Sequence, residues 1–180
     1  MPITWTAQQI RSALLKRELS ATEFTQDCLD RIQQREPIVG AWESLNPDRA
    51  LHQAKEADVA LTQSQSGLLQ GIPIAIKDIF ATVDYPTGWG TPIHAGKWLG
   101  YDAAVVERLR SAGAIIMGKT VTTEYATAKA GKTRNPHHPD HTPGGSSSGS
   151  AAAVADGMVP VAIGSQTLHY WRLRAGWLRS

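Results

Sequence analysis

One stretch constrains this chain of 180 residues more than any other: the run TPGGSSSGSAAAVA from Thr142 to Ala155. Its glycines allow the backbone to bend sharply, its serines supply a row of hydroxyl groups, and its alanines favour a helix. We therefore expect hydroxyl groups at a helix N-terminus, where unpaired backbone N–H groups favour negative charge. A flexible Gly/Ser linker has a similar composition, but the alanine-rich continuation argues against it.

The rest of the chain alternates between helix signals and short apolar runs. Capping patterns mark four helix starts, at Thr6, Ser20, Asn46 and Asp102. Four runs have the length and composition of strands: 42–45, 72–76, 114–117 and 159–163. This order predicts an α/β fold with a mixed, largely parallel sheet flanked by helices. Cys28 lies on the apolar stripe of the second helix, which favours a buried structural thiol.

Composition narrows the class of protein. Hydrophobic residues make up 42% of the sequence, and no apolar run approaches the roughly 18 residues that span a membrane. The N-terminus lacks the pattern of a secretory signal peptide and the single cysteine fits a reducing compartment, so we expect a cytoplasmic protein. The net charge of +2 derives from arginines in residues 168–180, and we therefore expect no nucleic-acid partner.

The Ser/Gly stretch resembles the core motif of the amidase signature family, and three further segments resemble that family in the same order. They are GIPIAIKD at 71–78, GAIIMGKT at 113–120 followed by EYA at 124–126, and GMVPVAIGSQT at 157–167. The resemblance covers residues 1–167 and leaves residues 168–180 as an Arg/Trp-rich tail. It implies the N-terminal part of an amidase signature domain, because the family's full domain is well over twice as long.

The resemblance also implies a chemistry: cleavage of a small-molecule amide by a Ser, cis-Ser, Lys triad without metal or organic cofactor. Lys77 matches the lysine and Ser146 matches the bridging serine. In such a relay a desolvated lysine accepts a proton through a serine hydroxyl and so activates the nucleophile. Taken alone, Lys77 also fits a surface lysine paired with Asp78. Substrate or oxyanion contacts are implied at three further positions, Gly145, Gln166 and Thr167.

The nucleophile expected from the resemblance is missing. The family continues Gly-Ser-x-Thr with Gly-Gly-Ser, whereas this chain has Leu168, His169 and Tyr170. A tyrosine with a pKa near 10 is no substitute, and losing a nucleophile costs on the order of a million-fold in rate, so we expect an inactive chain. Our hypothesis for the tail is a frameshift, because codons can be chosen for residues 170–173 that read one base later as Thr-Gly-Gly-Ser.

Several alternatives remain open from the sequence. Residues 145–149 fit the G-x-S-x-G elbow of α/β-hydrolases, with Ser147 as nucleophile, although no strand is expected directly before it. A metal site is conceivable from four neighbouring residues, His137, His138, Asp140 and His141. The chain also fits a non-catalytic remnant or binding fragment, or a piece of the glutaminase-like subunit of a tRNA-dependent amidotransferase. The oligomeric state is open.

Overall fold

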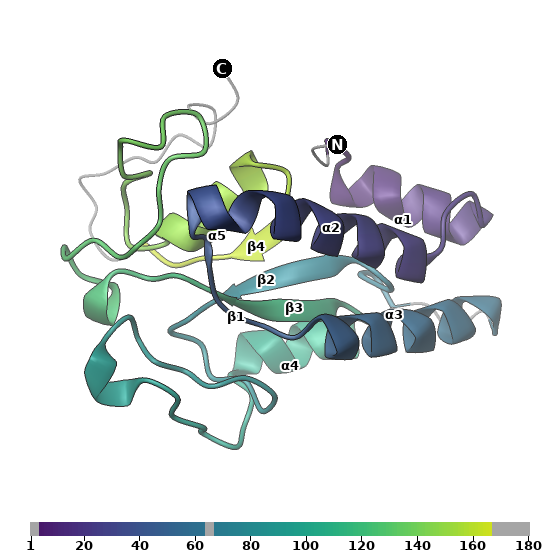
Figure 1. Ribbon diagram of the computed structural model, residues 1–180. Helices are drawn as coiled ribbons and strands as arrows, with labels where there is room; N and C mark the ends of the chain where they lie inside the picture. The colour runs from purple at the N-terminus through teal and green to yellow at the C-terminus, as the bar shows by residue number, and fades with distance from the viewer. Residues whose placement is uncertain (1–3, 64–66, 167–180) are drawn as a thin grey trace.

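The structure is a computed structural model that describes residues 4–63 and 67–166. In chain order its elements are α1 (Ala7–Lys16), α2 (Ala21–Val39), β1 (Trp42–Leu45), α3 (Pro47–Thr62), β2 (Pro73–Lys77), η1 (Pro92–His94), α4 (Ala104–Ser111), β3 (Ile115–Thr120), η2 (Glu124–Ala126), α5 (Ser148–Ala155) and β4 (Val161–Ile163). Figure 1 shows α1 and α2 above the strands and α4 below them. The four strands expected from the sequence are therefore confirmed, with shifted ends.

The strands form one mixed sheet in the order β1-β3-β2-β4. β2 runs parallel to both of its neighbours, β3 and β4, whereas β1 pairs with β3 in antiparallel fashion. All five residues of β2 are buried, which explains why this strand is an uninterrupted apolar run up to its last residue, Lys77. The α/β fold with a largely parallel sheet is confirmed.

Three of the four predicted helix starts are correct. Thr6 with Gln9 and Ser20 with Glu23 form complete capping boxes at α1 and α2, and Asn46 accepts a hydrogen bond at the start of α3. Asp102 was predicted to cap α4, and that prediction is wrong because the N-cap is Ala103. The Asp102 carboxylate instead accepts hydrogen bonds from Val83 N at 2.7 Å and Arg110 Nε at 2.8 Å.

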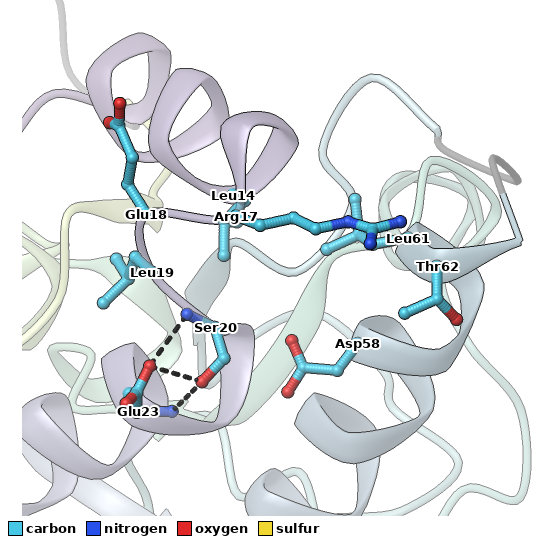
Figure 2. Close-up of a pocket in the computed structure, with 9 residues that line it drawn as sticks. All are labelled: Leu14, Arg17, Glu18, Leu19, Ser20, Glu23, Asp58, Leu61 and Thr62. Carbon is cyan, nitrogen blue, oxygen red and sulfur yellow. Dashed lines mark hydrogen bonds between the residues drawn. The ribbon is translucent and has the colours of Figure 1, made fainter.

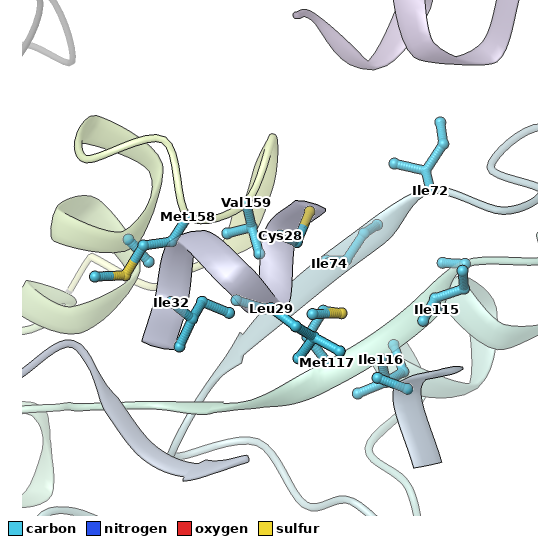
Figure 3. Packing of buried hydrophobic residues seen from close by; sticks show 14 of the residues in the cluster. Cys28, Leu29, Ile32, Ile72, Ile74, Ile115, Ile116, Met117, Met158 and Val159 are labelled. Carbon is cyan, nitrogen blue, oxygen red and sulfur yellow. The ribbon is translucent and has the colours of Figure 1, made fainter. Parts of the chain in front are cut away.

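The hydrophobic core lies between the sheet and α2. Figure 3 shows Cys28, Leu29 and Ile32 of α2 facing side chains of the strands, among them Ile74 and Met117. Cys28 is completely buried, as its place on the apolar stripe predicts, and burial raises the pKa of its thiol above the ordinary range. In the part of the chain that the structure describes, no helix is long and apolar enough to cross a membrane.

The start of α5 is packed directly onto the backbone of Val121, the residue that follows β3, and of Ala41, which precedes β1. Gly149 N donates a hydrogen bond of 3.0 Å to Val121 O. A Cβ at Gly149 would overlap the carbonyl oxygen of Ala41 and the backbone of Val121, so only glycine fits at this contact. The glycine within the Ser/Gly stretch thus fixes how closely the helix that follows the serines approaches the sheet.

Candidate functional site

Three parallel strands bring the candidate residues to one edge of the sheet. β2 ends at Lys77, β3 ends at Thr120, and β4 ends just before Gly164 and Ser165. The Ser/Gly stretch joins them there, because α5 begins at Ser148 and contacts all three strands. The carboxyl ends of parallel strands are where α/β proteins place their chemistry.

Lys77 is held by two serine hydroxyls at this edge. Its side chain is completely buried, and Nζ donates hydrogen bonds of 2.8 Å to Ser146 Oγ and of 2.8 Å to Ser165 Oγ. Among residues 4–63 and 67–166, no carboxylate forms an ion pair with this amine. Burial lowers the pKa of Lys77 from 10.5 to about 8, so a substantial fraction is neutral near physiological pH.

Ser146 is positioned through its backbone. Its carbonyl oxygen accepts hydrogen bonds from Thr123 N at 3.1 Å and from Thr122 Oγ1 at 3.2 Å, just after the end of β3. The hydroxyl is thereby directed to Lys77, and the structure brings together the two residues that the sequence predicted as partners. The resemblance implied a cis peptide bond at this serine, whereas the peptide bonds of the described residues are all trans.

Ser165 was not predicted as part of the site. Its backbone N donates to Ser147 Oγ at 3.0 Å, and Ser147 Oγ donates to Ser165 O at 2.9 Å, so the two residues lock the end of β4 to the start of α5. The sequence feature that could have identified Ser165 is the Gly-Ser-Gln-Thr run after β4. We interpreted that run only as the approach to the missing nucleophile, and not as a source of a hydroxyl that contacts Lys77.

Asp78 does not pair with Lys77, so the interpretation of Lys77 as a surface lysine paired with Asp78 is wrong. Asp78 lies on the opposite side of the strand end, where its Oδ1 is 2.9 Å from Lys119 Nζ and its Oδ2 accepts a hydrogen bond of 3.0 Å from Gly88 N. Successive residues of a strand point to opposite faces, which separates Lys77 from Asp78.

The three positions implied to bind substrate or oxyanion are less well supported. Gly145 and Gln166 are exposed close to the two serines, and Gly145 has the left-handed φ of +67° that glycine accommodates readily. Thr167 lies outside the described residues. Tyr170, at the position expected for the nucleophile, lies outside them as well.

The two rival sites have little structural support. No strand directly precedes Ser147, which is the N-cap of α5 with its hydroxyl engaged by Ser165, so the elbow geometry is missing. Across the described ranges no group of three or more His, Cys, Asp or Glu residues is arranged to hold a metal ion. The alternative of a metal site at His137, His138, Asp140 and His141 therefore gains no support from the described residues.

A pocket of about 460 Å³ lies away from this edge, between the end of α1, the start of α2 and the end of α3. Figure 2 shows Asp58 and the capping pair Ser20 and Glu23 within it. The Asp58 carboxylate accepts hydrogen bonds from Ala21 N at 2.6 Å and Thr22 N at 3.0 Å, so it caps α2. This pocket is a helix junction whose acidic groups are already engaged.

The comparison with protein families agrees with the geometry. The model of the family Amidase matches residues 23–167. A glutamyl-tRNA(Gln) amidotransferase subunit of Chloroflexus aurantiacus is 45% identical over 172 residues, a match covering 92% of this chain and 35% of that protein. The corresponding subunit of Corynebacterium jeikeium is 41% identical, with 91% and 34% covered. The chain thus spans about a third of the length of the curated relatives it matches.

Solved structures give the same result. The native peptide amidase from Stenotrophomonas maltophilia superimposes with a TM-score of 0.82 at 36% identity, covering 88% of this chain and 35% of that one. A bacterial aryl acylamidase of the amidase signature family superimposes with a TM-score of 0.79 at 29% identity, covering 88% and 34%. The similarity includes both β2 with Lys77 and the Ser/Gly stretch, because the matched family region contains them.

Proposed function

We propose that this chain, which belongs to the amidase signature family, carries the proton-relay half of a centre that hydrolyses the carbon–nitrogen bond of amides. The observation that supports this most directly is the buried Lys77 Nζ at 2.8 Å from Ser146 Oγ. A lysine whose pKa is lowered to about 8 is neutral often enough to accept a proton, which is what a general base must do.

The proposed relay moves one proton in each direction. A nucleophilic hydroxyl gives its proton to Ser146 Oγ as its oxygen bonds to the amide carbon, and Ser146 passes its own proton to neutral Lys77 Nζ. The same path returns a proton to the leaving nitrogen when the carbon–nitrogen bond breaks. Ser146 is suited to this step because its hydroxyl can donate and accept at once. No metal or organic cofactor takes part in the proposed steps.

The chain as it stands is proposed to be inactive toward amides. Its sequence has Tyr170 where the family pattern predicts the nucleophilic serine, and Leu168 and His169 replace two glycines. We propose an amidase unit over residues 1–167 and a separate tail over residues 168–180, supported by a family match that ends at residue 167. A frameshift remains our explanation of the tail.

The test restores the missing residues and asks whether the relay activates them. We expect a fluorophosphonate probe to label the triple variant L168G/H169G/Y170S at position 170 but not the original chain. Adding K77M or S146A to the triple variant should abolish labelling, because the restored hydroxyl then has no base. Labelling that persists unchanged in both of these variants contradicts the proposed roles of Lys77 and Ser146. S20A, a distant capping change, serves as the control substitution.

A second candidate is a subunit of a larger assembly, because the relatives from Chloroflexus aurantiacus and Corynebacterium jeikeium are amidotransferase subunits. In that case the amide substrate supplies nitrogen for transfer, and partner subunits bind the chain. Co-purification from the source cell with a second polypeptide in fixed stoichiometry would favour the amidotransferase alternative.

We also propose a cytoplasmic location, supported by the lone buried thiol of Cys28. We propose neither a nucleic-acid nor a membrane contact for this unit.

A further inference from the structure

Lys119 is a second completely buried lysine beside the site, and the proposed relay does not use it. It lies in β3, and its Nζ is 2.9 Å from Asp78 Oδ1. The same Nζ donates hydrogen bonds of 2.8 Å to Thr87 Oγ1 and 3.1 Å to Pro86 O. One ammonium group therefore joins the residue that follows Lys77 to two successive residues of the loop between β2 and α4.

The loop is tied to the same residue at two more points. Gly88 N donates to Asp78 Oδ2 at 3.0 Å, and Trp89 N donates to Asp78 O at 3.1 Å. With the contacts of Lys119, the segment from Pro86 to Trp89 is attached to the end of β2 through both the side chain and the backbone of Asp78. Each contact alone is modest, but together they hold the segment at several points, and removing one member of a buried charge pair leaves the other charge uncompensated.

The attached segment leads on to the bridging serine. Trp89 O accepts a hydrogen bond of 2.8 Å from Tyr125 N, in η2, and Thr123 N, just before η2, donates to Ser146 O. Trp89 and Tyr125 both have left-handed backbones, with φ of +52° and +48°, which are costly for bulky residues and persist only where surrounding contacts impose them. The contacts of Lys119 are therefore well placed to support this strained connection.

We propose that Lys119 is a positioning residue that clamps residues 86–89 onto the end of β2 and thereby, through η2, holds Ser146 against Lys77. The inference rests on the proposed function, because it assigns Lys119 a role in the relay of Lys77 and Ser146. Without the clamp, η2 and Ser146 loosen and water reaches Lys77. The amine then becomes easier to protonate, which weakens it as a base at neutral pH.

The effect of Lys119 on the pKa of Lys77 is measurable because the groups in contact with the Lys77 amine carry no charge. The elements packed against its amine present the uncharged hydroxyls of Ser146 and Ser165. The charged groups that act on Asp78 and Lys119 are themselves paired: Asp78 with Lys119, Glu43 with Lys132, and Asp84 with Arg49 and Arg110. A change in the titration of Lys77 on altering Lys119 therefore reports on hydration or on the release of Asp78, and a double variant separates these two causes.

The experiment follows the Nζ resonance of Lys77 by NMR across pH 6 to 11 in the chain labelled with ¹³C and ¹⁵N lysine, with K77M used for assignment. In the original chain we expect a pKa near 8. In K119M we expect it to rise toward 10.5, with faster amide hydrogen exchange at residues 87–89 and 123–125. In K119M/D78N the rise should persist, because the contacts to Pro86 and Thr87 are still lost although no unpaired carboxylate remains.

Each other outcome has a definite meaning. A pKa that returns to about 8 in K119M/D78N shows that the unpaired Asp78 caused the rise, which overturns the positioning role. An unchanged pKa in both folded variants overturns it as well. If K119M does not fold, the double variant, which buries no unpaired charge, decides the question alone. K16M, which removes an exposed lysine–carboxylate pair with Glu18 at the end of α1, away from η2, is the matched control and should leave the pKa unchanged. A pKa near 10.5 in the original chain would instead contradict the proposed function itself.

Discussion

Replacing Gly149 by alanine tests how the Ser/Gly stretch is held on the sheet. The added methyl group would overlap the carbonyl oxygen of Ala41 and would lie 2.9 Å from Val121 O, and both neighbours are backbone atoms that cannot turn away. Gly149 itself does not have a left-handed φ, so the change introduces overlap without backbone strain. Overpacking against rigid neighbours costs about 3 kcal/mol of unfolding free energy.

Gly144 provides the matched control within the same stretch. It has a left-handed φ of +76°, yet a Cβ there would meet no atom within 4 Å. G144A therefore adds strain without overlap, and should cost about 1 kcal/mol. Urea denaturation followed by circular dichroism compares the two variants with the original chain. If G149A is no less stable than G144A, the close approach of α5 to β3 is not what requires glycine, and this explanation of the motif fails.

Two further predictions concern Lys77 and Asp58. The pKa of Lys77 is about 8 in the folded chain and 10.5 when unfolded, so between these pH values the unfolded state binds more protons. The free energy of unfolding should therefore rise with pH across this window by about 3 kcal/mol relative to K77M. Urea denaturation at several pH values measures this, and parallel curves of unfolding free energy against pH for the two chains would refute it. D58A removes the carboxylate that caps α2 and should lower the free energy of unfolding by about 2 kcal/mol. The control D30A, at an exposed site, should lower it by under about 0.5 kcal/mol. Equal urea midpoints for the two variants would contradict the capping role.

Apolar runs and capping patterns predicted the strands and most helix starts well, because these segments adopt the structure that their own residues favour. The apolar runs became strands, and capping patterns placed the starts of α1, α2 and α3. Asp102 is the exception. Aspartate is a common N-cap residue, but the Asp102 carboxylate accepts hydrogen bonds from Arg110 Nε and from Val83 N. An ion pair with Arg110, eight residues on, and a backbone bond from Val83, 19 residues back, occupy the carboxylate instead, and a capping pattern indicates neither partner.

The site was predicted only in part for a similar reason. Lys77 and Ser146 were found because the resemblance identified both, and the structure places them 2.8 Å apart. Ser165 and Lys119 were missed, since each contacts its partners across strands. A lysine inside the apolar run of β3 was a signal in itself, because a buried lysine requires a partner, but the sequence does not say which carboxylate lies opposite.

The place of β2 between β3 and β4 sets the order in which the site is assembled during synthesis. β2 reaches β3 through the crossover of residues 78–114, which contains α4, whereas Lys77 meets Ser146 and Ser165 only across 69 and 88 residues. Closing such long loops follows the local contacts. A nascent chain that has not yet reached Ser146 and Ser165 lacks both hydroxyls that contact Lys77, so we expect its lysine to be hydrated and protonated. We therefore expect the pKa of Lys77 to fall only once β4, the last of the four strands in the described residues, has been made.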